Sequence, residues 1–185
     1  HQLRIFYKHY VDSHGRKIQS FQFDYYLNCT PEQYGNFQED FDEQKKLDPG
    51  VERFEILEGP LSDGTVNNSV FYLAYPKIVV SKGREFVYLK TSQYGKDEYR
   101  DVSRSIDHPL MPLNHHHVRA EMILCGNYAV RADDPKTGKS RVRVRSIADT
   151  DVKASVPSFI IKQVAKANLK KMVETTVNRI NQLYN

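Results

Sequence analysis

The sequence has few of the features that mark secreted, membrane-spanning or disulfide-stabilised proteins. Its 185 residues include no tryptophan and two cysteines, Cys29 and Cys125, whose spacing matches neither a CxxC motif nor a zinc site. We expect both to be free, buried thiols in a reducing compartment. The longest hydrophobic run, Val70 to Tyr75, is far shorter than the roughly 20 residues that span a bilayer. Residues 1–8 lack the apolar run of a secretory signal, but a targeting segment upstream stays open, so this absence does not decide the localisation. The expected free thiols favour a cytoplasmic protein.

Motifs of the common enzyme and metal-site classes are also missing. The sequence contains no HExxH, GxSxG or Walker-type loop. His115, His116 and His117 are consecutive, and consecutive side chains on an extended chain point to opposite faces, so they do not converge on one ion. The sequence therefore predicts no metal, no cofactor and no catalytic residue. A pairing of Cys125 with a histidine in space stays open as an enzymatic alternative.

The formal net charge of +4 is distributed unevenly along the chain. Residues 1–93 carry 11 Lys/Arg and 13 Asp/Glu, whereas residues 94–185 carry 16 and 10, which gives net charges of −2 and +6. The basic second half favours an anionic surface such as a membrane leaflet, with a solvated basic face as the alternative. Arg141, Arg143 and Arg145 alternate with valines and have no aromatic residues among them, so we expect no nucleic-acid binding.

Period-two alternation of apolar and polar residues dominates the chain and predicts strands. Short turn signals such as Ser13-His14-Gly15 and Lys82-Gly83 separate these runs. They make neighbouring strands antiparallel, because a parallel return needs a crossover of about a dozen residues or more. The predicted strands cover residues 3–10, 17–27, 51–57, 69–75, 85–91, 99–106, 118–131 and 141–148.

Two segments have helical patterns instead. Thr30-Pro31-Glu32-Gln33 is a capping box with proline at the first helical position, which predicts a helix that runs toward Lys46. Apolar residues recur with a period of 3.6 from Ile161 to Leu183, which predicts one long helix over Val156–Tyr184. An antiparallel sheet of seven to nine strands with such a helix is an α+β arrangement, in which the sheet curls around the helix to bury both apolar surfaces. We predict one domain over residues 1–185.

From Tyr75 onward, the order of short motifs resembles the START family, the lipid-transfer domains related to the steroidogenic acute regulatory protein. The family has a P-x-R-D-F-V stretch, an S-x-x-H-P-x-x-P segment, a V-R strand opening and a D-x-K-G-W-I-P lead into its terminal helix. The corresponding motifs here are Tyr75-Pro76, Gly83 to Lys90, Ser105 with His108-Pro109 and Pro112, Val118-Arg119-Ala120, and Asp151-Val152-Lys153 with Val156-Pro157.

This resemblance implies a helix-grip fold that lacks the family's N-terminal helix. A curved sheet and the C-terminal helix would enclose a hydrophobic tunnel, which carries one lipid between membranes without chemical change. Such a carrier replaces the bilayer, because lipid chains exposed to water cost about 0.8 kcal/mol per CH₂. The resemblance also implies a lid formed by the 91–97 loop and the terminal helix, with the lid residues Tyr94, Gly95, Ile161, Val164 and Met172.

The resemblance places Phe71, Phe86 and Lys90 in the tunnel lining. Strand alternation puts two sets of side chains on one face each: Phe71, Leu73 and Tyr75, and Phe86, Tyr88 and Lys90. An inward-pointing lysine needs an anionic partner, and a lipid phosphate would serve. The alternative is an ordinary apolar core in which Lys90 reaches solvent.

Two further residues, Ile123 and Gln44, follow from the choline-lipid carriers of the family, which surround the quaternary ammonium with aromatic rings. The equivalent positions are Phe71, Phe86 and Ile123, and the basic residue that meets the phosphate aligns near Gln44. Arg84 is assigned either a structural or a ligand-binding role. Sterol binders of the family have an acid at the position of Phe71, so its absence favours a phosphatidylcholine-like glycerophospholipid over a sterol.

The predicted function is therefore noncatalytic lipid binding and transfer by a monomer that contacts membrane surfaces transiently. Its partners would be a phospholipid or a sterol, with no nucleic acid. A helix-grip enzyme and a ligand sensor are the alternatives, because one fold hosts several functions.

Overall fold

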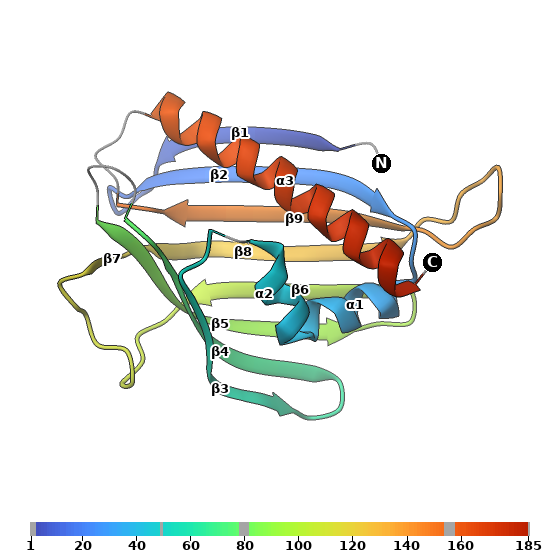
Figure 1. Cartoon of the computed structure of the whole chain (residues 1–185), viewed down its shortest axis with the longest axis horizontal. Coiled ribbons are helices and arrows are strands. Elements are labelled where there is room, and N and C mark those ends of the chain that lie inside the picture. Colours follow the sequence, from blue (N-terminus) through green and yellow to red (C-terminus); the bar gives the residue numbers. More distant parts are fainter. Residues whose placement is uncertain (1–2, 49, 78–81, 154–157, 185) are drawn as a thin grey trace.

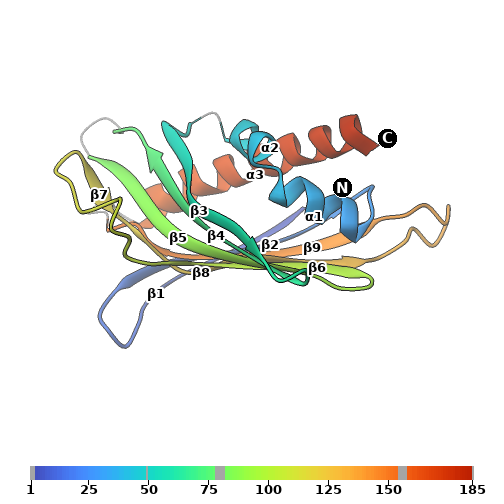
Figure 2. The ribbon, with the colours of Figure 1, turned by 90° about the horizontal axis from the view of Figure 1, so that it is seen from below.

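The computed structural model describes residues 3–48, 50–77, 82–153 and 158–184. These residues form one nine-stranded sheet in the order β1-β2-β9-β8-β6-β5-β4-β3, with β7 paired to β5. Three helices lie on the same side of the sheet, and the longest crosses it diagonally (Figures 1 and 2). The predicted α+β helix-grip arrangement is confirmed.

The strands are linked mainly as antiparallel neighbours, as the short turns predict. An exception is β7, which pairs with β5 in parallel. The long 106–116 connection that precedes β7 makes this return possible. The strands are β1 Arg4–Val11, β2 Lys17–Leu27, β3 Arg53–Ser62, β4 Val66–Tyr75, β5 Gly83–Tyr94, β6 Glu98–Ser105, β7 His117–Arg119, β8 Glu121–Arg131 and β9 Val142–Asp151.

The predicted helix from Thr30 toward Lys46 is two helices, α1 Pro31–Glu39 and α2 Phe41–Leu47. The capping box is confirmed, because Thr30 accepts a bond from the backbone of Gln33 and the Gln33 side chain accepts one from the backbone of Thr30. Asp40 has extended backbone angles and accepts a bond from the Glu43 amide, so it ends α1 and caps α2. A single continuous helix was thus the wrong prediction, because aspartate also serves as an N-cap.

Two other segments differ from the predicted pattern. The predicted 118–131 strand is interrupted at Ala120 and forms β7 and β8. The predicted 91–97 loop is mostly strand, because β5 continues to Tyr94 and β6 begins at Glu98. The Gly95 amide donates to the Glu98 carbonyl and closes a tight hairpin turn.

The C-terminal helix α3, Ser158–Tyr184, covers the core on the helical face of the sheet. Its Val173 and Ile180 are fully buried in a cluster with Phe23 and Tyr25 of β2. Full burial of one such aliphatic side chain contributes about 1.5–3 kcal/mol. None of the helices in the described ranges is both long and apolar enough to cross a bilayer.

On the opposite face, the segment between β6 and β7 covers β4 and β5. Glu85 of β5 is 1% exposed and accepts bonds from Tyr72 Oη at 2.8 Å and Asn114 Nδ2 at 2.7 Å. Its second oxygen pairs with Arg119 of β7, 2.9 Å away. These bonds fix the connecting segment to the sheet and join two of the motifs found in the sequence.

Candidate functional site

A cavity of about 320 Å³ lies between the two short helices and strands β3 to β6. It is bounded on the helical side by α1 and α2, which lie in front of the sheet in Figure 1. Of the residues predicted from the sequence, Gln44, Phe71, Tyr88 and Lys90 line it. The remaining wall consists mainly of Gln38, Glu39, Phe41, Phe54, Ile56, Pro60, Ser62, Asn67, Ser69, Asp101, Ser103 and Asn127.

One wall of this cavity is aromatic. Phe41 lies with its ring centroid 4.8 Å from Phe54, Phe54 lies 5.6 Å from Phe71, and Phe71 lies 5.4 Å from Tyr88. The four rings come from α2, β3, β4 and β5, so they form a continuous surface across four elements. Aromatic surfaces of this kind bind apolar groups and, through their π-faces, cations.

The adjoining part of the cavity carries charge. Lys90 Nζ lies 2.9 Å from Glu39 Oε1 and donates to the Gln38 carbonyl at 2.8 Å. Tyr99 Oη donates to the same carboxylate at 2.7 Å. Burial acts to raise the pKa of Glu39, but the Lys90 ammonium and these hydrogen bonds outweigh it and hold the pKa below its usual range. The inward lysine thus has the anionic partner that the sequence argument requires, and this partner is part of the protein.

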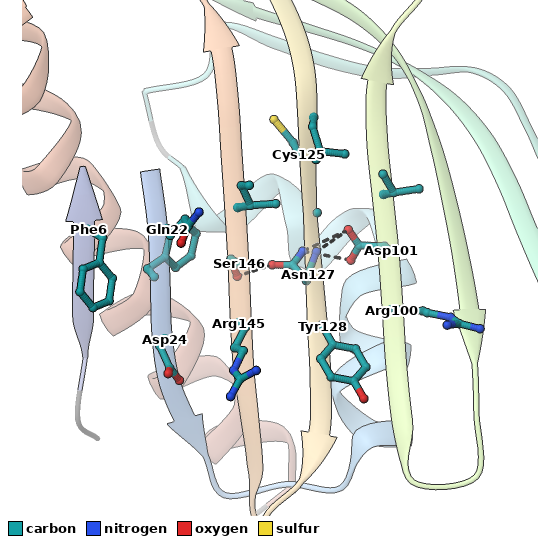
Figure 3. Close-up of a pocket in the computed structure, with 15 residues that line it drawn as sticks. Phe6, Gln22, Asp24, Arg100, Asp101, Cys125, Asn127, Tyr128, Arg145 and Ser146 are labelled. Carbon is teal, nitrogen blue, oxygen red and sulfur yellow. Dashed lines mark hydrogen bonds between the residues drawn. The ribbon is translucent and has the colours of Figure 1, made fainter. Parts of the chain in front are cut away.

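Asp101 extends the polar part of the cavity along the sheet. Asn127 Nδ2 donates to its carboxylate at 3.0 Å, and Ser146 Oγ donates to Asn127 Oδ1 at 2.6 Å (Figure 3). Burial raises the pKa of Asp101, and the charge of Lys90 offsets this in part. The cavity therefore holds one ammonium, two carboxyl groups and several uncharged donors and acceptors.

Leu73, Tyr75 and Phe86 lie on the same sheet face but beyond the cavity. They pack with Ala120 in the same apolar cluster as the cavity residues Phe54, Phe71 and Tyr88, and the ring centroids of Tyr75 and Phe86 are 6.4 Å apart. Burial raises the pKa of Tyr75. These residues extend the apolar surface along β4 and β5, as the alternation predicts.

Arg84 and Ile123 lie away from the cavity. Arg84 Nε donates to the Val152 carbonyl at 2.8 Å, and its Nη2 lies 3.4 Å from the Lys153 carbonyl, so it holds the segment that leads toward α3. Ile123 sits at a β-bulge of β8 and lines a different recess together with Arg16. Of the three proposed cage positions, only Phe71 lines the cavity.

The predicted lid residues whose side chains are described lie in two places. Tyr94 donates to Asn36 Oδ1 at 3.2 Å, and Gly95 forms the hairpin turn that follows it. Met172 of α3 packs against the core cluster on the helical face. The side chains of Ile161 and Val164, which also belong to α3, lie outside the described residues.

Sequence reasoning missed Glu39, Phe41, Phe54, Asp101 and Asn127. Asp101 shares its strand face with the buried Tyr99 and Ser103, so alternation alone was sufficient to point it inward. Glu39 and Phe41 depend on the break at Asp40, which the single predicted helix did not include. In the described ranges, no group of three or more His, Cys, Asp or Glu side chains is placed to hold a metal ion, and Cys29 and Cys125 are free thiols, the first buried and the second partly exposed.

Comparison with known proteins identifies the architecture around this cavity. A family model described as START domain matches residues 31–184. Human StAR-related lipid transfer protein 7, mitochondrial, is 31% identical over 102 residues, which cover 52% of this chain and 26% of that protein. The match thus spans about a quarter of the length of that relative.

Two solved structures share the fold. Human StAR-related lipid transfer protein 5 has a TM-score of 0.72 at 16% identity and covers 97% of this chain and 88% of its own. Human STARD10 has a TM-score of 0.67 at 18% identity and covers 91% of this chain and 72% of its own. Because the family model also matches most of the sequence, the chain belongs to the START domain family.

Proposed function

We propose that this START domain carries one glycerophospholipid with a phosphatidylcholine-like head group between membranes, and that the head group occupies the cavity beside Lys90. Membership in the family supports lipid binding in general. The observation that favours this lipid class is the combination of the Lys90–Glu39 pair and Asp101 with an aromatic wall in one cavity.

A zwitterionic head group matches both halves of the cavity. Lys90 offers an ammonium to a phosphate, and charge-assisted hydrogen bonds of this type are about twice as strong as neutral ones. Glu39 and Asp101 offer negative charge to a quaternary ammonium, and the rings of Phe41 and Phe71 add cation–π attraction.

A sterol fits the same cavity less well. Its polar part is one hydroxyl group, which satisfies one or two of the polar groups that line the cavity. Other polar groups, such as Asn67 and Ser103, would then be covered by apolar surface without partners. Each buried polar group left unsatisfied costs about 1–3 kcal/mol.

The volume supports a movement during loading. A cavity of about 320 Å³ is at the small end of ligand pockets, and a lipid with two acyl chains is larger. We propose that α3, including Ile161, Val164 and Met172, moves as the lid while the domain touches the membrane surface as a monomer.

The test is native mass spectrometry of the purified chain, followed by extraction and identification of bound lipid and a transfer assay between liposomes. We expect one phospholipid per chain and transfer of phosphatidylcholine. Phe71→Ala is expected to reduce both, and Leu61→Ala on the exposed edge strand β3 is the matched control. A bound sterol would overturn the lipid class, and an empty chain that transfers no lipid would overturn the carrier function.

A further inference from the structure

The sheet face opposite the helices has an open recess of about 580 Å³ that the lipid-binding proposal does not use. It crosses β1, β2, β9, β8 and β6, and in Figure 3 the helices lie behind these strands. Several of its outward side chains are apolar and solvent-exposed. Phe6 is 60% exposed, Val102 and Leu124 are each 43% exposed, and Tyr128 is 38% exposed. Single exposed apolar residues are ordinary, but a contiguous patch on a sheet face marks an interaction site.

A glycine lines this recess at a position where β6 and β8 approach closely. Gly126 of β8 lies opposite Val102 of β6 and Ile147 of β9. A Cβ atom at this position would overlap the backbone carbonyl oxygen of Asp101, so the close approach of β6 and β8 requires glycine. One row of paired residues crosses the strands and consists of Phe6, Gln22, Ile147, Gly126 and Val102. Because Gly126 has no side chain, this apolar row has a hollow between its apolar ends, Phe6 and Val102.

Positive charge borders this row on both sides. One neighbouring row across the strands contains Arg4, Arg145 and Arg100, and the opposite side has Lys8 and Arg104; all five are exposed. Figure 3 shows Arg145, Tyr128 and Arg100 aligned across β9, β8 and β6. Carboxylates also lie on this face: Arg143 binds Asp24, Tyr128 donates to Glu98, and Tyr10 donates to one oxygen of Asp149 at 3.4 Å. The second oxygen of Asp149 is buried and has no hydrogen-bond partner in the described part of the chain.

We propose that this face binds an amphipathic helix of a partner protein, with apolar side chains along one side and carboxylates on both flanks. Strands are about 4.8 Å apart and one helical turn rises about 5.4 Å, so a helix laid across the strands presents about one apolar residue per strand. The distance from Phe6 on β1 to Val102 on β6 is four strand spacings, about 19 Å, which equals about 13 residues of helix.

The flanking rows match the same partner. They lie two residues along the strands from the apolar row, about 7 Å to either side. This is within reach of acidic side chains on the flanks of a helix about 10 Å wide. A bilayer surface would meet the arginines but would leave the hollow at Gly126 unfilled, whereas a protruding leucine fills it.

The test uses fluorescence anisotropy with a labelled synthetic helical peptide of about 18 residues, roughly 27 Å long. This peptide has leucine once per turn and glutamate on both flanks, and a second peptide has lysine in place of each glutamate. We expect saturable binding of the glutamate peptide to the full chain and none of the lysine peptide. Two variants are each expected to weaken binding of the glutamate peptide by about tenfold or more. One is Phe6→Ala, and the other combines Arg100→Glu with Arg145→Glu.

Matched controls are Leu61→Ala, which removes an apolar side chain that is 67% exposed on β3, and Lys171→Glu on the exposed face of α3. Both are expected to bind the peptide as the unchanged chain does. Far-UV circular dichroism and the lipid mass from native mass spectrometry check that each variant is folded and loaded. A variant that loses peptide binding but still retains lipid therefore shows that this face binds the peptide. Such a result does not depend on whether the proposed carrier function is correct.

Three results would overturn the proposal: no binding of the glutamate peptide, equal binding of both peptides, or variants that bind like the unchanged chain. Flotation with phosphatidylserine-containing vesicles tests whether a membrane surface, and not a partner helix, binds this face. Vesicle binding that depends on Phe6 and Arg145, without peptide binding, would assign this face to a membrane instead.

Discussion

Replacing Lys90 by methionine removes the ammonium from the cavity while it keeps most of the side chain's apolar volume. The ammonium bonds Glu39 Oε1 at 2.9 Å and the Gln38 carbonyl at 2.8 Å. Hydrogen bonds to charged groups contribute about 1.5–3 kcal/mol each, and the substitution also removes the cost of burying the ammonium. We expect the free energy of unfolding of the lipid-free domain to fall by about 2–3 kcal/mol at pH 7.

The loss of stability caused by Lys90→Met should become smaller as the pH falls. In the unchanged chain, the pKa of Glu39 is lowered, so its contribution to stability is present above the unfolded pKa of about 4.3 and is lost as the pH falls through the lower folded value. Without Lys90, we expect burial to outweigh the remaining hydrogen bonds from Tyr99 and Ser92 and to raise the pKa of Glu39 above that of the unfolded chain. The variant then gains stability on protonation, so the difference between the two chains should shrink between pH 7 and pH 4.

Urea unfolding followed by circular dichroism at both pH values measures this difference. Glu39→Gln and the double variant complete a thermodynamic cycle, for which we expect a coupling energy of about 2 kcal/mol at pH 7. Lys171→Met on the exposed surface of α3 is the control and should have little effect. A Lys90→Met variant as stable as the unchanged chain, or a loss of the same size at both pH values, would refute the assignment of Glu39 as the buried partner.

Three further substitutions test other parts of the structure. Glu85→Ala leaves the Arg119 guanidinium buried without its partner, so urea unfolding should show a loss of about 3–5 kcal/mol; a loss below about 1 kcal/mol would contradict the role of this pair. Gly126→Ala places a methyl group against the Asp101 carbonyl, and we expect a lower melting temperature and a cost of about 1–3 kcal/mol; an unchanged melting temperature would show that β6 and β8 can separate freely. Phe71→Ala removes part of the aromatic wall, and native mass spectrometry should show a reduced lipid-bound fraction, whereas unchanged occupancy would place the cargo elsewhere.

The sheet and the long helix could be predicted because their signals are local and repeated. The period-two runs define the strands to within a few residues at most ends, and β2 was predicted with its bounds at Lys17 and Leu27. The 3.6-residue period over α3 and the capping box at Thr30 likewise depend on neighbouring residues only. Such patterns show which residues share a face along each strand, and this supported the placement of Phe71 and Lys90 that the family resemblance implied and added Tyr88.

Two features that were predicted wrongly, the pairing of β7 and the position of Ile123, depend on contacts distant in sequence. β7 pairs with β5 in parallel across a separation that no turn signal encodes. The bulge in β8 changes the register between Met122 and Leu124, so the alternation that would place Ile123 on the cavity face does not continue through it. Ile123 lines another recess as a result.

The partner of Lys90 shows why the site is harder to predict than the fold. Glu39 is the last residue of α1, and its position above β5 follows from the end of that helix at Asp40 and the change of direction into α2. A helix that continued through Asp40 would carry Glu39 and Phe41 along one axis, instead of placing them at the charged end and the aromatic wall of the same cavity. One capping residue therefore determines which groups meet in the cavity, while the sheet that supports them is set by many residues that each contribute a little.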